Sequence, residues 1–200
     1  MLFESQIVDI MQQLPTAKIQ HDKEQLRGLD SQRRRVMTAE EVKTDSRKIV
    51  SQIEQMTCFK QAQTVMLYYP IHNEVDLRHL VHEYADEKTF LLPATVGNHQ
   101  IEVRVYEKNR PLLKGRFGIP EPDTEVWKGK IDLILVPGVA FDEDLYRLGR
   151  GGGYYDRFLK QYSGSMKVGV CYDFQLHKDL PSEFFDIRMD RVVTPSQTIG

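Results

Sequence analysis

The chain lacks long apolar runs. It has 200 residues, of which 40% are hydrophobic and 28% charged, and the apolar stretch 131–139 is interrupted by Asp132 and Pro137. That stretch falls far short of the ~20 residues that cross a bilayer. With Glu4 and Asp9, the first ten residues also lack the basic start and apolar centre of a signal peptide. We therefore expect a cytoplasmic globular protein with no membrane partner.

Cysteines are also few, and neither sign of charge predominates. Cys58 and Cys171 are the two cysteines, and a chain of this size does not need a disulfide, so we expect two reduced thiols. Without CxxC, HExxH or similar spacings a structural zinc site is not expected. The net charge of −2 excludes the broad basic field that nucleic-acid binding requires. Any anion site must be local, and nothing indicates an obligate protein partner.

No repeat, low-complexity tract or linker divides the chain, so we expect a single domain over residues 21–200. Residues 1–20 carry apolar positions at helical spacing before Pro15, which predicts a leading arm or short helix of unreadable role.

The elements alternate between helix and strand. The capping box Thr38–Glu41 and the apolar spacing behind it predict a helix. A helical pattern at 77–85 lies between β-rich runs at 64–69 and 89–92, and an alternating strand follows at 101–105. Residues 131–136 are apolar almost throughout, as in a central parallel strand, and 155–162 and 167–172 predict a helix and a strand. The fold class is therefore α/β, with a mainly parallel central sheet flanked by helices on both faces.

The stretch after the strand at 131–136 is where a ligand site is expected, because open α/β sheets bind ligands beyond the carboxyl ends of their strands. Four glycines occur there in five positions, 149 and 151–153. They allow close backbone approach, and the helix that follows adds its positive end, so the loop suits phosphate. Arg147, Arg150 and Arg157 supply donors and Asp156 a carboxylate for Mg²⁺. The alternative is a glycine-rich turn with solvated arginines.

The motif 147–157, Arg-Leu-Gly-Arg-Gly-Gly-Gly-Tyr-Tyr-Asp-Arg, together with 132–142 before it, closely resembles the signature of the 5-formyltetrahydrofolate cyclo-ligases. The resemblance extends to the Lys-x-x-Leu-Arg motif at 23–27, to Glu74, to Phe-Gly-Ile-Pro-Glu-Pro at 117–122 and to the closing segment 181–194. It covers about residues 20–195. It implies an ATP- and Mg²⁺-dependent ligase that converts 5-formyltetrahydrofolate to 5,10-methenyltetrahydrofolate, releasing ADP and phosphate, through phosphorylation of the formyl oxygen and ring closure by N10.

The resemblance also assigns residues. Arg147, Arg150 and Tyr154 would be catalytic, Glu74 and Tyr154 would bind folate, and Asp156 and Asp186 would hold Mg²⁺. The implied ATP-binding residues are Lys23, Arg27, Arg147, Gly149, Arg150, Gly151, Gly152, Gly153, Tyr154 and Tyr155.

Each assignment has a structural alternative. Lys23 and Arg27 could form a solvated basic helix face with Arg33, Arg34 and Arg35. Tyr155 could be core packing, Glu74 and Asp156 could complement helix dipoles, and Asp186 could pair with Arg188 or Arg191.

Three positions depart from many relatives: Gly152 where they have Lys, Phe185 where they have His and Leu145 where they have Gly. The departures at Gly152 and Phe185 keep open a folate- or nucleotide-binding protein without turnover. The glycine loop and the α/β layout also suit sugar phosphates, so a phosphosugar-handling enzyme of similar fold is a third possible function.

Overall fold

The structure, a computed structural model, describes residues 2–97, 99–182 and 186–200, with side chains from residue 17 onward. Its helices are α1 (Leu2–Arg35), α2 (Ala39–Gln55), α3 (Thr57–Gln61), α4 (Arg78–Tyr84) and α5 (Tyr154–Gln161), with short 3-10 turns at Arg116–Gly118 and Asp173–Gln175. Its strands are β1 (Thr64–Met66), β2 (Thr89–Val96), β3 (Gln100–Val105), β4 (Leu113–Lys114), β5 (Pro120–Glu121), β6 (Leu133–Pro137), β7 (Ala140–Asp142), β8 (Arg147–Leu148), β9 (Met166–Val170), β10 (Leu176–His177), β11 (Arg191–Val193) and β12 (Thr198–Ile199).

A seven-stranded sheet organises the chain, in the order β12-β11-β9-β6-β1-β2-β3. The pairs from β11 to β2 are parallel, and antiparallel β12 and β3 close the two edges. Strand β6 pairs in parallel with β1 and β9 and is buried from Leu133 to Val136, which confirms its prediction as a central strand. The small sheets β10-β7-β8 and β4-β5 lie outside this large sheet.

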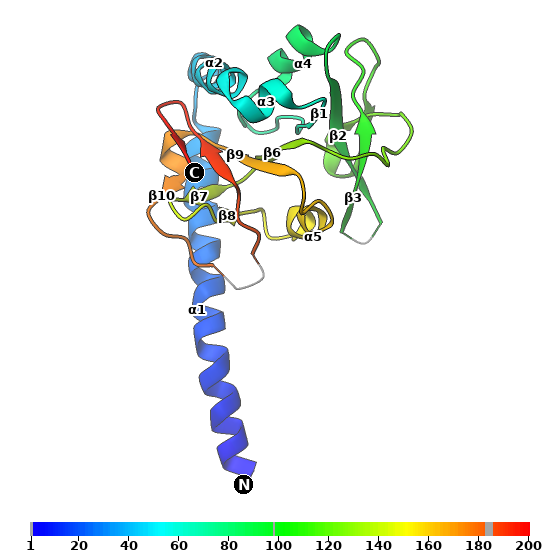
Figure 1. Cartoon of the computed structure of the whole chain (residues 1–200). Coiled ribbons are helices and arrows are strands. Elements are labelled where there is room, and N and C mark those ends of the chain that lie inside the picture. Colours follow the sequence, from blue (N-terminus) through cyan, green and yellow to red (C-terminus); the bar gives the residue numbers. More distant parts are fainter. Residues whose placement is uncertain (1, 98, 183–185) are drawn as a thin grey trace.

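Alternate residues of the central strands face two separate cores. Leu133 and Leu135 pack with Ile49, Ile53 and other side chains of α2, α3 and α4. Ile134 and Val136 lie in the second core with Phe158 and Leu159 of α5. A parallel strand apolar at every position needs cover on both faces, and the helices provide it (Figure 1). The predicted α/β domain with helices on both faces is therefore confirmed.

Helix α2 begins as predicted. The Thr38 hydroxyl accepts the Glu41 backbone N–H at 3.2 Å, and the Thr38 backbone N–H donates to the Glu41 carboxylate at 2.8 Å. Ile49, Val50 and Ile53 are buried on one face of this helix.

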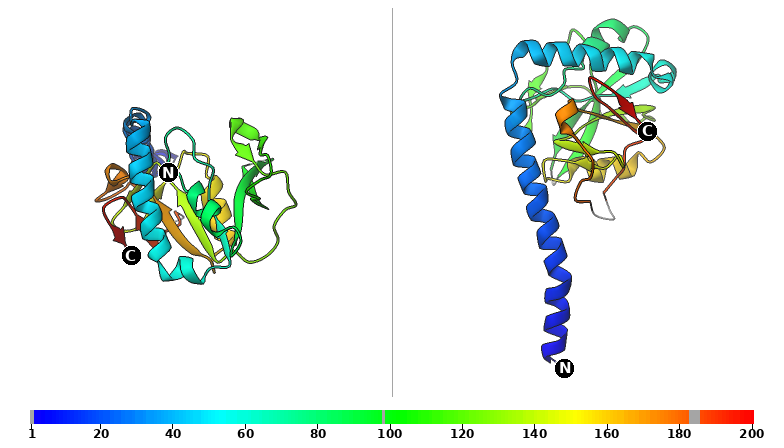
Figure 2. Two further views of the ribbon diagram at one scale, coloured as in Figure 1. Left: turned by 90° about the horizontal axis from the view of Figure 1, so that it is seen from above. Right: turned by 90° about the vertical axis from the view of Figure 1, so that its left-hand side faces the viewer.

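Residues 2–20 of the expected leading arm or short helix belong to α1, which continues through Pro15 as one helix from Leu2 to Arg35. A proline inside a helix removes one backbone donor and crowds the carbonyl four residues before it, but residues 17–35 are rich in good helix formers. From about residue 20 the helix lies along the rest of the domain (Figure 2).

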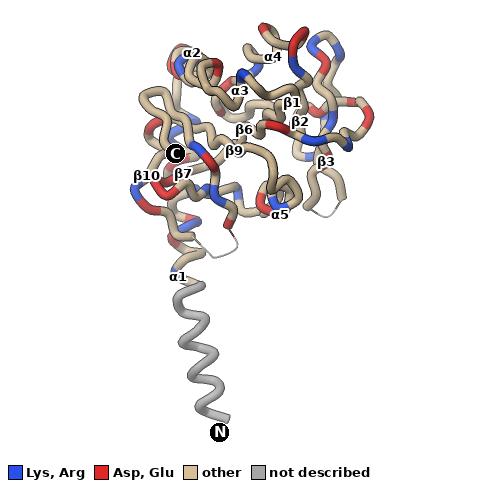
Figure 3. The backbone as a smooth tube through the Cα atoms, in the orientation of Figure 1, with Lys and Arg blue, Asp and Glu red and all other residues tan. Residues whose placement is uncertain are grey.

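In the part of the chain that the structure describes, no helix is long and apolar enough to cross a membrane. Basic and acidic residues are interspersed along that part rather than gathered in regions of one sign (Figure 3).

Candidate active site

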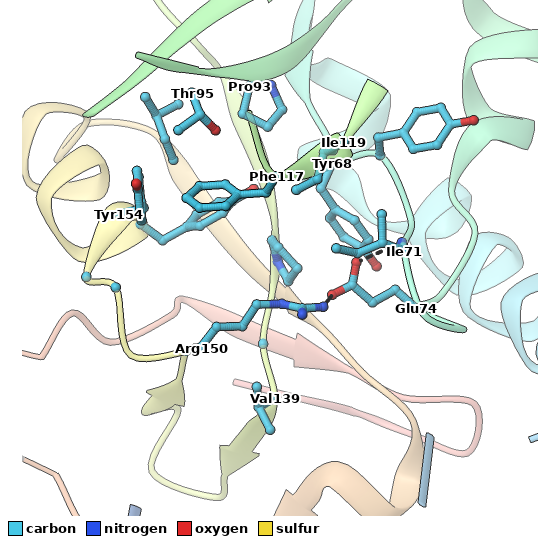
Figure 4. A pocket seen from close by; sticks show the side chains of 18 of the residues that line it. Tyr68, Ile71, Glu74, Pro93, Thr95, Phe117, Ile119, Val139, Arg150 and Tyr154 are labelled. Carbon is cyan, nitrogen blue, oxygen red and sulfur yellow. Dashed lines mark hydrogen bonds and ion pairs between the residues drawn. The ribbon is translucent and has the colours of Figure 1, made fainter. Parts of the chain in front are cut away.

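A cavity of about 460 Å³ opens beyond the carboxyl ends of the neighbouring strands β1 and β6. One wall carries Tyr68, Ile71 and Glu74 from the loop after β1, and the opposite wall is the glycine loop that leads into α5 (Figure 4). The volume is in the usual range for ligand pockets. The cavity lies at the edge of the sheet where the sequence predicts a ligand site.

The glycine loop has a conformation that side chains with a Cβ atom rarely adopt. Gly151 has φ +94° and Gly153, the residue before α5, has φ +63°. Both angles are in the left-handed region, where glycine is favoured. The loop backbone therefore reaches the cavity and delivers the amino end of α5 to it.

Arg147 is the buried cation of the site. Its guanidinium donates to the Asp156 carboxylate at 2.7 Å and lies over the Tyr155 ring, 5.5 Å from the ring centre. Its side chain is 4% exposed. The Nε atom is buried without a hydrogen-bond partner among the described residues. An unpaired buried donor is costly, so the Nε–H group of Arg147 is available to donate a hydrogen bond to a ligand.

Glu74 and Arg150 meet across the cavity. Arg150 Nη2 lies 2.7 Å from Glu74 Oε1, and the same oxygen is 3.7 Å from Arg34 Nη1 (Figure 4 shows the first pair). Glu74 is thus a carboxylate between two guanidinium groups. The two walls, 76 residues apart in sequence, are joined by this ion pair.

The loop that carries Glu74 is tightly held. His72 and Asn73 have φ values of +50° and +60°, in the left-handed region that His and Asn adopt more readily than most residues other than glycine. The Asn73 side-chain amide donates to the carbonyls of Arg34 and Met37 at the end of α1. The Tyr172 hydroxyl donates to the Asn73 carbonyl. Several contacts from outside therefore fix where Glu74 points.

An aromatic group borders the glycine loop. The Tyr154 ring is 5.1 Å from the His99 ring and 6.1 Å from the Phe117 ring, measured between centres. Arg157 holds the loop by donating to the Gly152 carbonyl. Pro93, Phe117, Ile119 and Tyr154 all line the cavity, and together they form an apolar wall suited to a flat ring system.

Burial raises the pKa of Tyr155 and that of Tyr68, and the Glu74 charge adds to both shifts. Both phenols therefore stay protonated at neutral pH and can act as hydrogen-bond donors but not as bases.

Most of the predicted site residues come together. Those that line the cavity are Glu74, Arg147, Gly149, Arg150, Gly152, Gly153, Tyr154, Tyr155 and Asp156. Arg27 lies behind the loop: it donates to the Gly149 carbonyl at 2.9 Å, and a Cβ atom at Gly151 would lie 3.7 Å from its guanidinium. Lys23 pairs with Asp186 at 3.1 Å, and both side chains are largely buried. Lys23 and Arg27 therefore contact other parts of the domain, and they do not form the solvated basic helix face that was the structural alternative.

The two predicted metal ligands have different neighbours: Asp156 faces the cavity and pairs with Arg147, whereas Asp186 pairs with Lys23. Among the described residues no three His, Cys, Asp or Glu side chains gather as a metal cage. Mg²⁺ needs only one or two carboxylates when phosphates complete its shell, so Asp156 fits a shared site. Phe185, where the family resemblance implies His, lies outside the described residues.

Sequence reasoning missed Arg34, which was grouped with Arg33 and Arg35 as a basic helix face. The available signal was spacing: Arg34 lies eleven residues, about three helical turns, after Lys23 and so shares its side of α1.

Residues 19–195 match the 5-formyltetrahydrofolate cyclo-ligase family. The chain belongs to this family. It is 33% identical to the probable 5-formyltetrahydrofolate cyclo-ligase of Schizosaccharomyces pombe over 79% of this chain and 87% of the relative. It is 32% identical to the 5-formyltetrahydrofolate cyclo-ligase of Escherichia coli K12 over 83% of this chain and 96% of that protein.

Solved structures agree with the sequence relatives. The NMR structure of Aquifex aeolicus 5,10-methenyltetrahydrofolate synthetase superposes with a TM-score of 0.80 and 40% identity, covering 88% of this chain and 91% of the other. The Mycoplasma pneumoniae 5,10-methenyltetrahydrofolate synthetase gives 0.70 and 27% over 86% and 98%. As a cyclo-ligase of this family, the chain is a ligase of folate one-carbon metabolism.

Proposed function

We propose that this chain converts 5-formyltetrahydrofolate to 5,10-methenyltetrahydrofolate, using ATP and Mg²⁺ and releasing ADP and phosphate. The observation that carries the proposal is the division of the cavity. Glu74 and an apolar, aromatic wall lie on one side, and the glycine loop with Arg147 and Arg150 lies on the other. The first side suits a pterin and the second a triphosphate, and the family implies a folate and ATP as substrates.

The reaction needs a better leaving group than a formyl oxygen. That oxygen attacks the γ-phosphorus, the bond from the γ-phosphorus to ADP breaks, and the oxygen becomes a phosphate ester. N10 then attacks the formyl carbon and loses its proton, and phosphate leaves with the original oxygen. Negative charge moves between the γ-phosphate and the formyl oxygen, so fixed cations and oriented backbone N–H groups are the main catalytic requirement.

Arg147 and Arg150 meet that requirement in different ways. Arg147 is buried and held by Asp156, so it gives a fixed positive field. Arg150 is 50% exposed and sits on the loop, so it can turn from Glu74 to the transferring phosphoryl group. The loop N–H groups and the amino end of α5 would receive the phosphate oxygens.

Glu74 would accept hydrogen bonds from the pterin amino group and a ring N–H, a paired geometry that a carboxylate matches. Tyr154 stands where the aromatic wall meets the loop and would contact both substrates. Lys23 and Arg27 would act on ATP phosphates, Arg27 from directly behind Gly149 and Gly151.

Asp156 would hold Mg²⁺ at the cavity, with Asp186 as the second proposed ligand. When bound, Mg²⁺ supplies charge neutralisation of the phosphates. The protein contributes the carboxylate and, through Arg147, its orientation.

A steady-state assay tests the proposal. Methenyl-folate absorbance should grow only when 5-formyltetrahydrofolate, ATP and Mg²⁺ are all present, with one ADP formed per methenyl product. Tight binding of both ligands without turnover would favour a binding protein instead, an alternative raised by Gly152, where many relatives have Lys. Hydrolysis or phosphoryl transfer with a phosphosugar, and no reaction with the folate, would favour a phosphosugar-handling enzyme.

A further inference from the structure

Arg34, at the end of α1, contacts both Glu74 and the loop that carries it. Its Nη1 atom is 3.7 Å from Glu74 Oε1, and its Nε donates at 3.1 Å to the carbonyl of His72 in the same loop. Arg34 does not touch the space where a ligand would bind, since it is absent from the residues that line the cavity. It contacts the Glu74 loop through both a charge and a hydrogen bond.

The two cations around Glu74 differ in freedom. The Arg34 side chain is 3% exposed, whereas the Arg150 side chain is 50% exposed. Arg34 is fixed by the end of α1, where Asn73 binds the Arg34 carbonyl. Arg150 belongs to the glycine loop and has solvent on one side. Of the two, Arg150 can leave Glu74, and Arg34 cannot.

The departure of Arg150 would have a cost without Arg34. Glu74 is 9% exposed, and a buried carboxylate that loses its partner is strongly destabilised. A second guanidinium keeps that charge compensated. Burial lowers the pKa of Arg34, and the Glu74 charge opposes that shift, but a guanidinium remains charged at neutral pH.

We propose that Arg34 is the positioning residue for Glu74. It fixes the carboxylate for the folate ring and keeps the Glu74 charge partnered while Arg150 serves the phosphates. This inference rests on the proposed function, because it assumes that Glu74 binds the folate.

The test combines single and double variants, with 5-formyltetrahydrofolate and a non-hydrolysable ATP analogue titrated by calorimetry and turnover measured separately. Arg34→Gln should weaken folate binding about ten- to a hundredfold, as expected for a lost charged interaction. ATP-analogue affinity should stay unchanged, and kcat at saturating folate should stay near the parent value, because Arg34 does not touch the reacting atoms. Exposed Arg35→Gln, the adjacent arginine, is the matched control and should leave both affinities unchanged.

The double variant Arg34→Gln/Glu74→Gln separates positioning from a general structural effect. If Arg34 acts through Glu74, the second change adds little to the loss already caused by Glu74→Gln. Fully multiplicative losses, or unchanged folate affinity in Arg34→Gln, would overturn the inference while leaving the cyclo-ligase reaction intact. If the parent shows no turnover, or Glu74→Gln leaves folate binding unchanged, the proposed function or its Glu74 assignment fails instead.

Arg34→Lys guards against a variant that does not fold. It keeps the charge but lacks the planar fork that reaches Glu74 and the His72 carbonyl together. Folate affinity should fall less than in Arg34→Gln, with thermal unfolding close to the parent. If Arg34→Gln does not fold, Arg34→Lys alone decides: a measurable loss confined to folate supports positioning, and parent-like folate affinity overturns it.

Discussion

Arg150 is the exposed member of the ion pair with Glu74, and its proposed task is at the phosphates. We expect Arg150→Ala to lower kcat by about 10²–10³, the usual cost of losing one donor to developing charge. Folate affinity should not fall, because Arg34 remains beside Glu74 and the Glu74 carboxylate is released from Arg150. Steady-state kinetics and a folate titration measure the two effects. An unchanged kcat would remove Arg150 from the chemistry.

Asp156 has two proposed partners, Mg²⁺ and Arg147. Asp156→Asn should raise the Mg²⁺ concentration needed for half-maximal rate, because one charged ligand becomes neutral. Excess Mg²⁺ should restore only part of the activity, since the Arg147 guanidinium also loses its counter-charge at 2.7 Å. Mg²⁺ titrations of the rate test this, with Asp186→Asn run in parallel. The same Mg²⁺ dependence as the parent would leave Asp156 as the partner of Arg147 alone.

Two of the departures that the family resemblance implies have structural consequences. Leu145 has φ +70°, a left-handed conformation that glycine adopts without strain. Here its side chain packs against the second core instead. At Gly152 a Cβ atom would approach the Tyr154 ring within 2.8 Å, so a lysine there requires that ring to lie elsewhere.

Asp132 connects the starts of β1 and β6. One of its carboxylate oxygens accepts hydrogen bonds from the backbone N–H groups of Gln63 and Thr64 and from the Thr64 hydroxyl. Lys130 pairs with the other oxygen at 3.0 Å. The Lys130 contact, followed by these hydrogen bonds, lowers the pKa of Asp132 to about 2.

The pKa shift gives a pH-dependent stability. Because the folded-state pKa lies below the ordinary value of 3.8, the stabilisation is complete above pH 3.8 and is lost as the pH falls through about 2. Asp132→Asn should therefore be less stable than the parent at pH 7, and the difference should shrink between these two values. Denaturant unfolding across that range measures it. Exposed Asp123→Asn is the control, and a constant difference at all pH values would contradict the account.

At the scale of the whole molecule, the Glu74–Arg150 pair joins the two walls of the cavity. Each substrate is expected to draw one member away from the other, so binding of either frees a group that the second needs. A non-hydrolysable ATP analogue should therefore raise folate affinity by about fivefold or more, and folate should raise analogue affinity by the same factor. Calorimetric titration with and without the second ligand measures this coupling. It should disappear in Arg150→Ala, and persistence there would assign it to another contact.

The sequence by itself predicted the main helices and the inner strands of the large sheet, and it indicated where a ligand site should lie. The apolar run at 131–136, the capping box at Thr38 and the glycines at 149–153 are local signals, because side-chain polarity, cap chemistry and backbone freedom act over a few residues. Because open α/β sheets bind ligands beyond the carboxyl ends of their strands, the sequence also predicted a ligand site after β6. Family resemblance, carried by contiguous motifs, supplied the expected reaction.

Only the tertiary structure decided how the site residues are partnered. Arg150 meets Glu74, Arg147 meets Asp156 and Lys23 meets Asp186 over separations of 76, 9 and 163 residues. The role of Arg34 became visible only when the Glu74 loop was seen against the end of α1. Charges pair through space, and an arginine has the same local pattern in solvent as under a buried carboxylate, so spacing along the chain cannot distinguish the two.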